Sequence, residues 1–242
     1  MASKNQVPTA VDKGIFSFAR PNASEPERLA ILSAAADAFF EFGFNNTSVD
    51  EIADRLGASK GQVYHYYRSK SDILFDIQQS ATEAYLAAVT PIAKSTHPSD
   101  KRLWLMAREH ALFTIRNVAF ARVALFSTKF PNYRTDSQRR AHTEISKRRR
   151  EYENLFVTTI TEGIKDGSFR NVEPILANKV LLGALNWLAY WYSPGNDTPE
   201  RQDAIAIEVA NFVVSGFAAS ARLPLQVDEE YPVSNDATLS AS

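Results

Sequence analysis

One short polar segment of the sequence has side chains that are well suited to binding an anion. Between Arg55 and Ser71 the chain carries four basic residues and no acidic residue, and hydroxyl, amide and imidazole groups lie among them. Side chains of these types can contact the phosphates and base edges of duplex DNA. A solvated charged surface is the alternative interpretation. The basic residues are Arg55, Lys60, Arg68 and Lys70.

This segment is predicted to lie on two short helices joined by a tight turn. Ser48 and Glu51 have the spacing of a capping box at the start of a helix, and Gly57 is a typical stop signal for that helix. Ser59 then begins a second short helix, which ends near Tyr67. Two such helices packed on a third form a helix-turn-helix, whose second helix enters the major groove.

The second helix is expected to expose most of its polar side chains. Val63 and Tyr67 are four residues apart and should face inward. Gly61 leaves one position bare, so that the backbone can approach a phosphate or base closely. Gln62 can pair with adenine through its amide, or it can complete a capping box with Ser59. The side chains left outside would be Lys60, Gln62, Tyr64, His65 and Tyr66.

The segments from Thr47 to Ala53 and from Leu56 to Lys70 resemble the TetR family of bacterial transcriptional regulators, most strongly in the Tyr-x-Tyr-Tyr-x-Ser-Lys run that ends at Lys70. The resemblance covers roughly residues 27–75. It implies an all-helical homodimer that represses transcription from a palindromic operator in double-stranded DNA and releases the DNA when a small effector binds. With the residue pattern, it predicts DNA contacts at Thr47, Ser48, Ser59, Lys60, Gly61, Gln62, Tyr64, His65, Tyr66 and Lys70.

The rest of the chain also has helical periodicity, so we expect an all-α fold. A three-helix DNA-binding domain is predicted at 25–70, and a larger helical domain for effector binding and dimerisation at 71–222. Flexible segments are predicted at 1–24, as an arm, and at 223–242, as an acidic tail. The expected helices, besides the two in the helix-turn-helix, span about 27–42, 70–93, 100–127, 135–166, 172–192 and 198–221.

The helix expected at 100–127 carries His110 and Asn117 within an apolar stripe. A few polar groups in an apolar lining are typical of an effector pocket, although for any single residue core packing with satisfied side chains is the favoured interpretation. Arg116 and Arg122 are expected to be solvated or to bind an acidic ligand. The predicted ligand-binding residues are Met106, His110, Phe113, Asn117, Phe120, Asn186, Trp187 and Tyr190.

The resemblance places the dimer contact on the last two long helices, at 172–192 and 198–221, which are rich in apolar and small residues. Some members of the family respond to acyl-CoA thioesters. The basic run at 139–150 could hold the phosphates of such a ligand, or it could be a solvated face.

Composition excludes several other classes of function. The chain has no cysteine, which excludes disulfides, Cys-ligated zinc and thiol catalysis, and its four histidines are scattered. With no catalytic motif we expect neither an enzyme nor a cofactor or metal site. A net charge of −1 argues against a general polyanion binder, and no apolar stretch is long enough to span a membrane, so we expect a cytoplasmic protein. The alternatives are a helical ligand-binding or adaptor protein without specific DNA binding, and an activator of the same fold.

Overall fold

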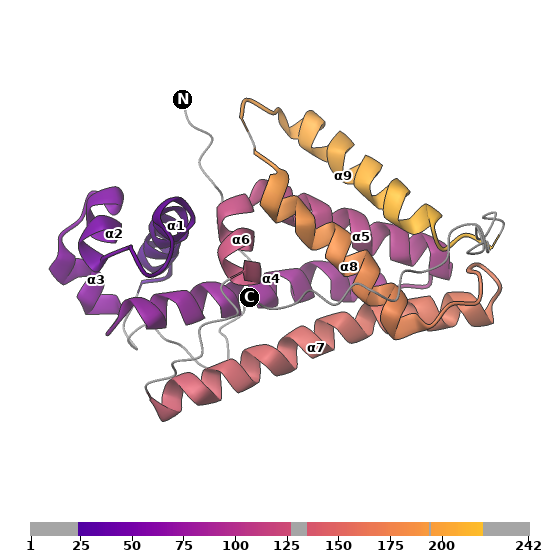
Figure 1. Ribbon diagram of the computed structural model, residues 1–242, viewed down its shortest axis with the longest axis horizontal. Helices are drawn as coiled ribbons and strands as arrows, with labels where there is room; N and C mark the ends of the chain where they lie inside the picture. Colours follow the sequence, from indigo (N-terminus) through magenta and orange to yellow (C-terminus); the bar gives the residue numbers. More distant parts are fainter. Residues whose placement is uncertain (1–23, 127–134, 194, 220–242) are drawn as a thin grey trace, which may run out of the picture.

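The computed structural model describes residues 24–126, 135–193 and 195–219, which form nine α-helices and no strand (Figure 1). The all-α prediction is therefore confirmed for this part of the chain. The predicted arm at 1–24 and tail at 223–242 lie outside the described residues, except for Ser24, which caps the first helix. The helices are α1 (Glu25–Phe42), α2 (Val49–Leu56), α3 (Lys60–Tyr66), α4 (Lys70–Ala93), α5 (Ser99–Arg116), α6 (Val118–Phe126), α7 (Asp136–Lys165), α8 (Pro174–Trp191) and α9 (Pro199–Ser215).

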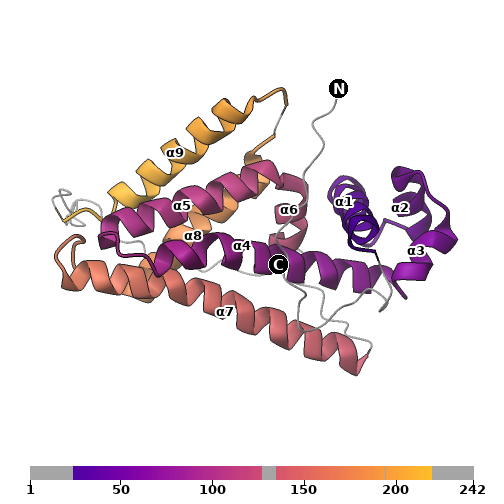
Figure 2. The same ribbon diagram turned by 180° about the vertical axis from the view of Figure 1, so that it is seen from behind.

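Helices α1, α2 and α3 form the helix-turn-helix at one end of the molecule, against the first turns of α4 (Figures 1 and 2). The predicted capping box at the start of α2 is present, with the Ser48 hydroxyl and the Glu51 carboxylate each accepting a backbone N–H of the other residue. Gly57 then adopts φ +70°, a left-handed conformation that glycine favours, and the chain turns directly into α3.

The core of the helix-turn-helix extends past residue 70. Residues of α4 and α6 pack in one buried cluster with those of α1, α2 and α3, which include Ile31 and Leu32 of α1. Helices α4 and α6 also border the larger domain. A movement of either helix therefore changes the packing of the helix-turn-helix. The cluster members from these two helices are Ile73, Leu74, Ile77, Ala81, Phe120, Val123 and Ala124.

One expected helix is in fact two. The helix predicted at 100–127 is interrupted at Asn117, so α5 ends at Arg116 and α6 begins at Val118. Asn117 has φ −130° and ψ 43°, outside the helical range, and both its backbone N–H and its side-chain amide donate to the carbonyl of Phe113. The interruption turns α6 away from the line of α5 and toward α1 and α4.

The larger domain is built from the rest of α4 and from α5, α7, α8 and α9. Helix α7 runs along α4, and α9 lies along α5 on the opposite side of the domain (Figures 1 and 2). Its core includes Leu103, Met106, Phe156, Ile160 and Leu185. Within the described ranges, no helix has the length and apolar character needed to cross a membrane. The domain boundaries at 71 and 222 remain predictions.

Candidate DNA-binding surface and effector cavity

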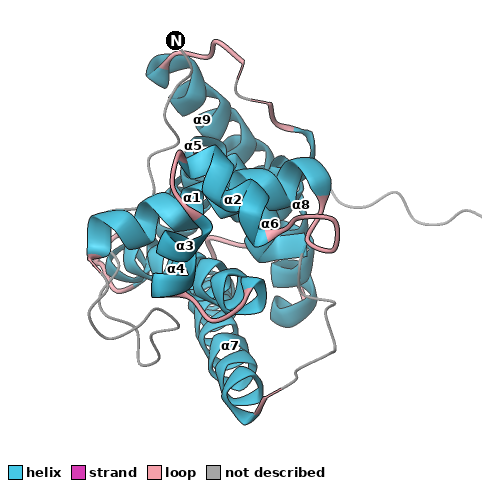
Figure 3. Cartoon of the chain, turned by 90° about the vertical axis from the view of Figure 1, so that its left-hand side faces the viewer, coloured by secondary structure: helices cyan, strands magenta, loops and turns pink. Residues whose placement is uncertain are grey.

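Helix α3 presents a polar face at the end of the molecule that Figure 3 views directly. Val63 and Tyr67 are buried, as the sequence predicts, with exposed fractions of 1% each. The exposed positions of the helix are Lys60, Gly61, Gln62, Tyr64 and His65. Five of the predicted contact residues therefore share one accessible face, where they can reach a major groove.

The starts of α2 and α3 lie next to each other on this surface. The Lys60 ammonium is 2.9 Å from the Asp50 carboxylate, and both side chains are more than half exposed. Ser48 and Ser59 are exposed N-caps whose hydroxyl oxygens accept backbone N–H groups, at 3.1 Å from Glu51 and 3.2 Å from Gln62. The Ser59 hydroxyl keeps its own proton available for a phosphate oxygen, whereas the Ser48 hydroxyl also interacts with the Glu51 carboxylate and lowers its pKa.

Gln62 makes only one half of a capping box. Its backbone N–H donates to Ser59, but no hydrogen bond from its side chain to Ser59 is found, unlike the reciprocal pair at Ser48 and Glu51. The Gln62 amide is exposed. This arrangement leaves the amide available for a base edge, and the base contact itself remains a prediction.

Two predicted contact residues are not exposed. Thr47 has an exposed fraction of 2%, and its hydroxyl donates to the carbonyls of Gly43 at 2.8 Å and Ala38 at 3.2 Å. Tyr66 has an exposed fraction of 5%, and its hydroxyl donates to the Glu27 carboxylate. The expectation that the Tyr66 side chain is on the exposed face of the helix is therefore wrong, because its ring belongs to the same buried cluster as Val63.

Lys70 has a structural role in the loop between α1 and α2. Its ammonium donates to the carbonyls of Phe44 at 2.6 Å, Asn45 at 3.0 Å and Thr47 at 2.7 Å. An ammonium group has three N–H donors, so all three are occupied by the loop between α1 and α2. Partial burial lowers the pKa of Lys70. The structure therefore does not support the expected direct contact between Lys70 and a phosphate.

A buried polar cluster fixes the helix-turn-helix to α4. The Asp76 carboxylate, 1% exposed, accepts hydrogen bonds from Arg28 of α1 at 2.9 Å and from the Tyr67 hydroxyl at 2.7 Å. Arg28 also donates to Ser80 at 2.8 Å. Because the partners come from α1, the end of α3 and α4, the cluster holds the exposed face of α3 at a set angle to α4.

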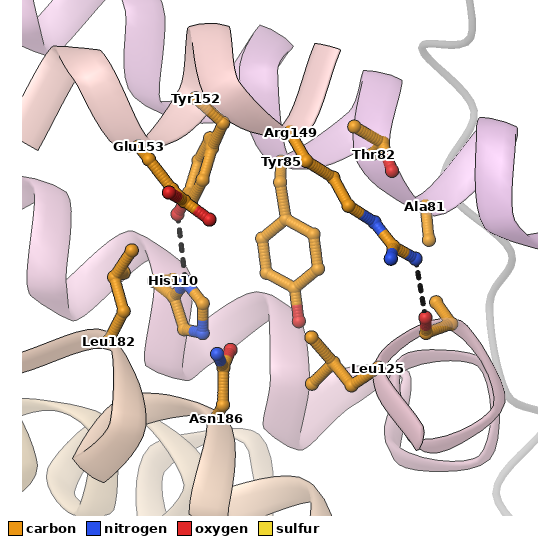
Figure 4. Close-up of a pocket in the computed structure, with 11 residues that line it drawn as sticks. Ala81, Thr82, Tyr85, His110, Leu125, Arg149, Tyr152, Glu153, Leu182 and Asn186 are labelled. Atoms are coloured by element: carbon orange, nitrogen blue, oxygen red, sulfur yellow. Dashed lines mark hydrogen bonds between the residues drawn. The ribbon is translucent and has the colours of Figure 1, made fainter. Parts of the chain in front are cut away.

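A cavity of about 90 Å³ lies in the larger domain, where α4, α5, α6, α7 and α8 meet (Figure 4). His110 and Asn186, two of the predicted ligand residues, line it. The cavity is mostly apolar, with a few polar groups that point inward, as small-molecule sites usually are. Its lining residues are Ala81, Thr82, Tyr85, His110, Ala124, Leu125, Arg149, Tyr152, Glu153, Leu182 and Asn186.

The aromatic and imidazole groups inside the cavity are uncharged. Burial lowers the pKa of His110 to about 3, against a smaller opposing effect of the Asn186 amide, so the imidazole is neutral near pH 7. His110 Nδ1 lies 2.7 Å from the Tyr152 hydroxyl, and the His110 ring stacks on Tyr85 with centroids 4.7 Å apart. Burial also raises the pKa of Tyr85 and of Tyr152.

The other predicted ligand residues lie outside this cavity. Met106 is fully buried against Thr159, and Phe113 packs on Tyr85. Asn117 caps α5, and Phe120 belongs to the core of the helix-turn-helix. The remaining two expected ligand residues, Trp187 and Tyr190, stack on each other on the surface.

Sequence reasoning missed the contribution of α4 and α7 to the cavity. Tyr85, Tyr152 and the exposed Glu153 at its edge were not expected there. Arg149 belongs to the basic run at 139–150, for which an anionic group of the ligand was one of two interpretations. A signal for Tyr152 does exist, because it continues the buried stripe that includes Phe156 on α7. The Arg149 guanidinium donates to the Ala124 carbonyl at 2.7 Å, which joins α7 to α6.

Helices α8 and α9 leave a broad apolar face exposed. Large side chains on this face are 52–85% exposed, far more than core residues. Patches of this kind mark interaction sites. The exposed residues include Leu176, Val180, Trp187, Tyr190, Trp191 and Phe212.

The guanidinium of Arg122 in α6 is hydrogen-bonded to backbone carbonyls. The expectation was that Arg122 is solvated or binds a ligand. Its guanidinium donates to the carbonyls of Ala189, Tyr190 at 2.9 Å and Tyr192 at 3.4 Å, at the end of α8. The same group lies 3.9 Å from the centroid of the Phe40 ring in α1. Arg122 therefore touches both the helix that carries Asn186 and the helix-turn-helix.

A helix-turn-helix with an accessible recognition helix, joined to a helical domain with an internal cavity, defines a ligand-binding transcriptional regulator. A family model described as bacterial regulatory proteins, tetR family, matches residues 31–77. A second model, described as tetracyclin repressor-like, C-terminal domain, matches residues 96–217. The chain belongs to the TetR family, as its motifs predicted.

Individual relatives support the same assignment. The HTH-type transcriptional repressor KstR2 of Rhodococcus jostii (strain RHA1) is 27% identical over 194 residues, which cover 79% of this chain and 91% of that protein. The fatty acid metabolism regulator protein of Bacillus subtilis (strain 168) is 24% identical over 193 residues, covering 79% and 95%. The TetR family regulator PfmR from Thermus thermophilus has a TM-score of 0.66 and 28% identity, covering 76% of this chain and 97% of that chain.

Proposed function

We propose that this protein is a homodimeric repressor that binds a palindromic operator and releases it when a small, largely apolar effector fills the cavity. The observation that carries the proposal is the exposed polar face of α3, held on α4 by buried hydrogen bonds. Its donors match the acceptors of phosphates and bases. KstR2, a relative over most of the chain, is named as a repressor.

The dimer is proposed to form through α8 and α9. Two copies that pair the exposed face around Val180, Trp187 and Phe212 remove these side chains from water, which favours association. A twofold dimer presents two copies of α3 to two similar half-sites, and this symmetry is the reason for expecting a palindrome.

The effector is proposed to be an acyl compound, either free or as a CoA thioester. The cavity offers an apolar lining for the acyl chain, and Arg149, a member of the basic run at 139–150, adds a positive charge at its edge. A relative named as a fatty acid metabolism regulator agrees with this class of ligand.

Arg122 provides a route from the cavity to the operator. An effector that displaces Asn186 shifts the end of α8, whose carbonyls Arg122 holds, and the guanidinium transmits the shift to Phe40 of α1. Allosteric release requires such an element, in contact with both sites, whose position each site biases.

The proposal is tested by selecting duplexes from fragmented genomic DNA with the full-length protein. We expect a palindromic sequence to be enriched, and its affinity to fall steeply with salt. Replacing both Gln62 and His65 with alanine should abolish the preference. Lys94→Ala, which changes an exposed residue at the opposite end of α4 from the helix-turn-helix, serves as the control. Recovery of no preferred sequence by the wild-type protein would contradict the proposal.

A further inference from the structure

Two buried polar atoms in the cavity have no protein partner. His110 Nε2 and Asn186 Oδ1 are both inaccessible to solvent, and neither has a hydrogen bond to any residue that the structure describes. Proteins nearly always give such an atom a partner, whether water, protein or ligand, because leaving it unpaired is costly. Other buried atoms without a partner, such as Asn178 Oδ1, belong to residues that do not line the cavity.

The two side chains approach each other across the cavity from α5 and α8 (Figure 4). The Asn186 amide acts on the pKa of His110 as a hydrogen-bonding neighbour. The two orphaned atoms, Nε2 and Oδ1, nevertheless lack the geometry of a hydrogen bond to each other. One small polar group in the cavity that contacts both atoms would therefore satisfy them.

The contact with Tyr152 determines what His110 offers to a ligand. A phenol hydroxyl is a good donor and a neutral imidazole nitrogen is a good acceptor, so the 2.7 Å contact places the proton on Tyr152 and leaves Nδ1 as the acceptor. The neutral ring then carries its own proton on Nε2. The pair therefore presents one donor, Nε2–H, and one acceptor, Oδ1.

The neighbouring polar groups are already engaged. Thr114 donates its proton to the His110 carbonyl at 2.9 Å, so the Tyr85 hydroxyl must be the donor in its 2.8 Å contact with Thr114. The charged groups that line the cavity are Arg149, which donates to Ala124, and Glu153, which is exposed at the edge.

We propose that His110 and Asn186 together bind a hydroxyl group of the effector. This inference rests on the proposed function, which makes the cavity the effector site. The hydroxyl oxygen accepts the proton of Nε2, and the hydroxyl donates its own proton to Oδ1. A carbonyl oxygen only accepts and leaves Oδ1 unpaired, a carboxylate is repelled by Oδ1, and a hydrocarbon leaves both atoms unpaired.

The size of the cavity limits how much of the effector it encloses. Its volume of about 90 Å³ is smaller than the roughly 150 Å³ of a cavity that holds benzene. The cavity therefore takes a short aliphatic segment that carries the hydroxyl. In a longer acyl compound the remainder would extend past Arg149 and Glu153.

The test compares three ligands with one three-carbon skeleton, each smaller than benzene: 2-propanol, acetone and propane. Each is titrated into the full-length protein while the nitrogen resonances of the histidines are followed by NMR. We expect the alcohol to bind about tenfold more tightly than the ketone, because it makes one more buried hydrogen bond, and the hydrocarbon to bind most weakly.

Two variants assign the preference to the proposed pair. Asn186→Leu removes the acceptor and should bring the alcohol to within about twofold of the ketone, because each then makes one hydrogen bond. His110→Phe removes the donor and should bring the ketone to within about twofold of the hydrocarbon. Because this variant lacks the cavity histidine, its binding is followed through the backbone amide resonances of residues that line the cavity. Asn178→Leu is the matched control, since it removes an orphaned amide oxygen from the same helix outside the cavity, and it should keep the preference. Asn186 is only partly buried, so its variant tests the inference if His110→Phe does not fold.

The outcomes separate this inference from the proposed function. A ketone that binds as tightly as the alcohol overturns the hydroxyl site, and so does equal binding of all three ligands, which would indicate that water satisfies the pair. Failure of all three ligands to bind also overturns it, while the operator selection still decides whether the protein is a repressor. If the alcohol binds as expected but does not release operator DNA in a fluorescence anisotropy assay, the hydroxyl site stands and the effector role fails.

Discussion

Replacing Gly61 with alanine should stabilise the protein and weaken its binding to DNA. Gly61 lies in the first turn of α3 without a positive φ, and a Cβ atom built there meets only the Ser59 hydroxyl oxygen, at 3.8 Å. The protein itself therefore has room for the methyl group. Alanine is more favourable than glycine in a helix by about 0.5–1 kcal/mol, so the free energy of unfolding should rise by up to this amount.

The effect on DNA has the opposite sign. Inserting a methyl group into a tightly packed contact costs about 1–3 kcal/mol, and a dimer makes this contact in both half-sites. Over the two half-sites, the binding free energy should become less favourable by at least about 2 kcal/mol, which corresponds to a loss of affinity of about 30-fold or more.

Fluorescence anisotropy with a labelled operator duplex measures the affinity, and thermal unfolding measures the stability. Gly216→Ala is a matched control, because its Cβ would also lie 3.8 Å from a single atom, the Val213 carbonyl oxygen, at the end of α9. If Gly61→Ala leaves operator affinity unchanged, the close approach of α3 to DNA is refuted. A lower unfolding temperature would refute the packing argument.

Four further predictions concern the contacts that the structure identifies. Lys70→Met removes three hydrogen bonds to the loop between α1 and α2 and should lower the free energy of unfolding by about 2 kcal/mol in denaturant titrations; unchanged stability would contradict this role. Asp50→Asn frees Lys60 for phosphate and should raise non-specific DNA affinity about threefold at low salt, a gain that high salt removes. Arg122→Gln should leave effector binding intact, as calorimetry would show, but reduce effector-driven release of DNA. Because the pKa of His110 falls from 6.5 to about 3 on folding, the stability it contributes is complete above pH 6.5 and is lost as the pH falls toward 3, by up to about 1.4 kcal/mol per pH unit; His110→Phe should remove this slope.

The sequence was sufficient to predict the helix-turn-helix because local signals define it. The capping box of Ser48 and Glu51 and the left-handed Gly57 depend only on residues a few positions apart, and the structure contains both. The same local pattern could not show that Tyr66 is buried, because the Glu27 carboxylate that accepts its hydrogen bond comes from another helix.

The effector cavity required the tertiary structure. Periodicity identified His110 as a polar residue on an apolar stripe, but Met106 and Phe113 have the same spacing and lie outside the cavity. Which residues of a stripe face a cavity depends on how the neighbouring helices pack against it, and the interruption at Asn117 places Phe120 in a different core.

The sequence by itself determined the fold class, the recognition helix and the family, since these follow from helical periodicity, capping residues and a contiguous motif. Only the tertiary structure decided which donors remain available on the surface and which groups meet inside. Lys70 and Arg122 have their donors occupied by backbone carbonyls distant in sequence, whereas His110 and Asn186 meet with two atoms unpaired. Hydrogen-bond partners of this kind are set by the packing of separate helices, which local sequence does not encode.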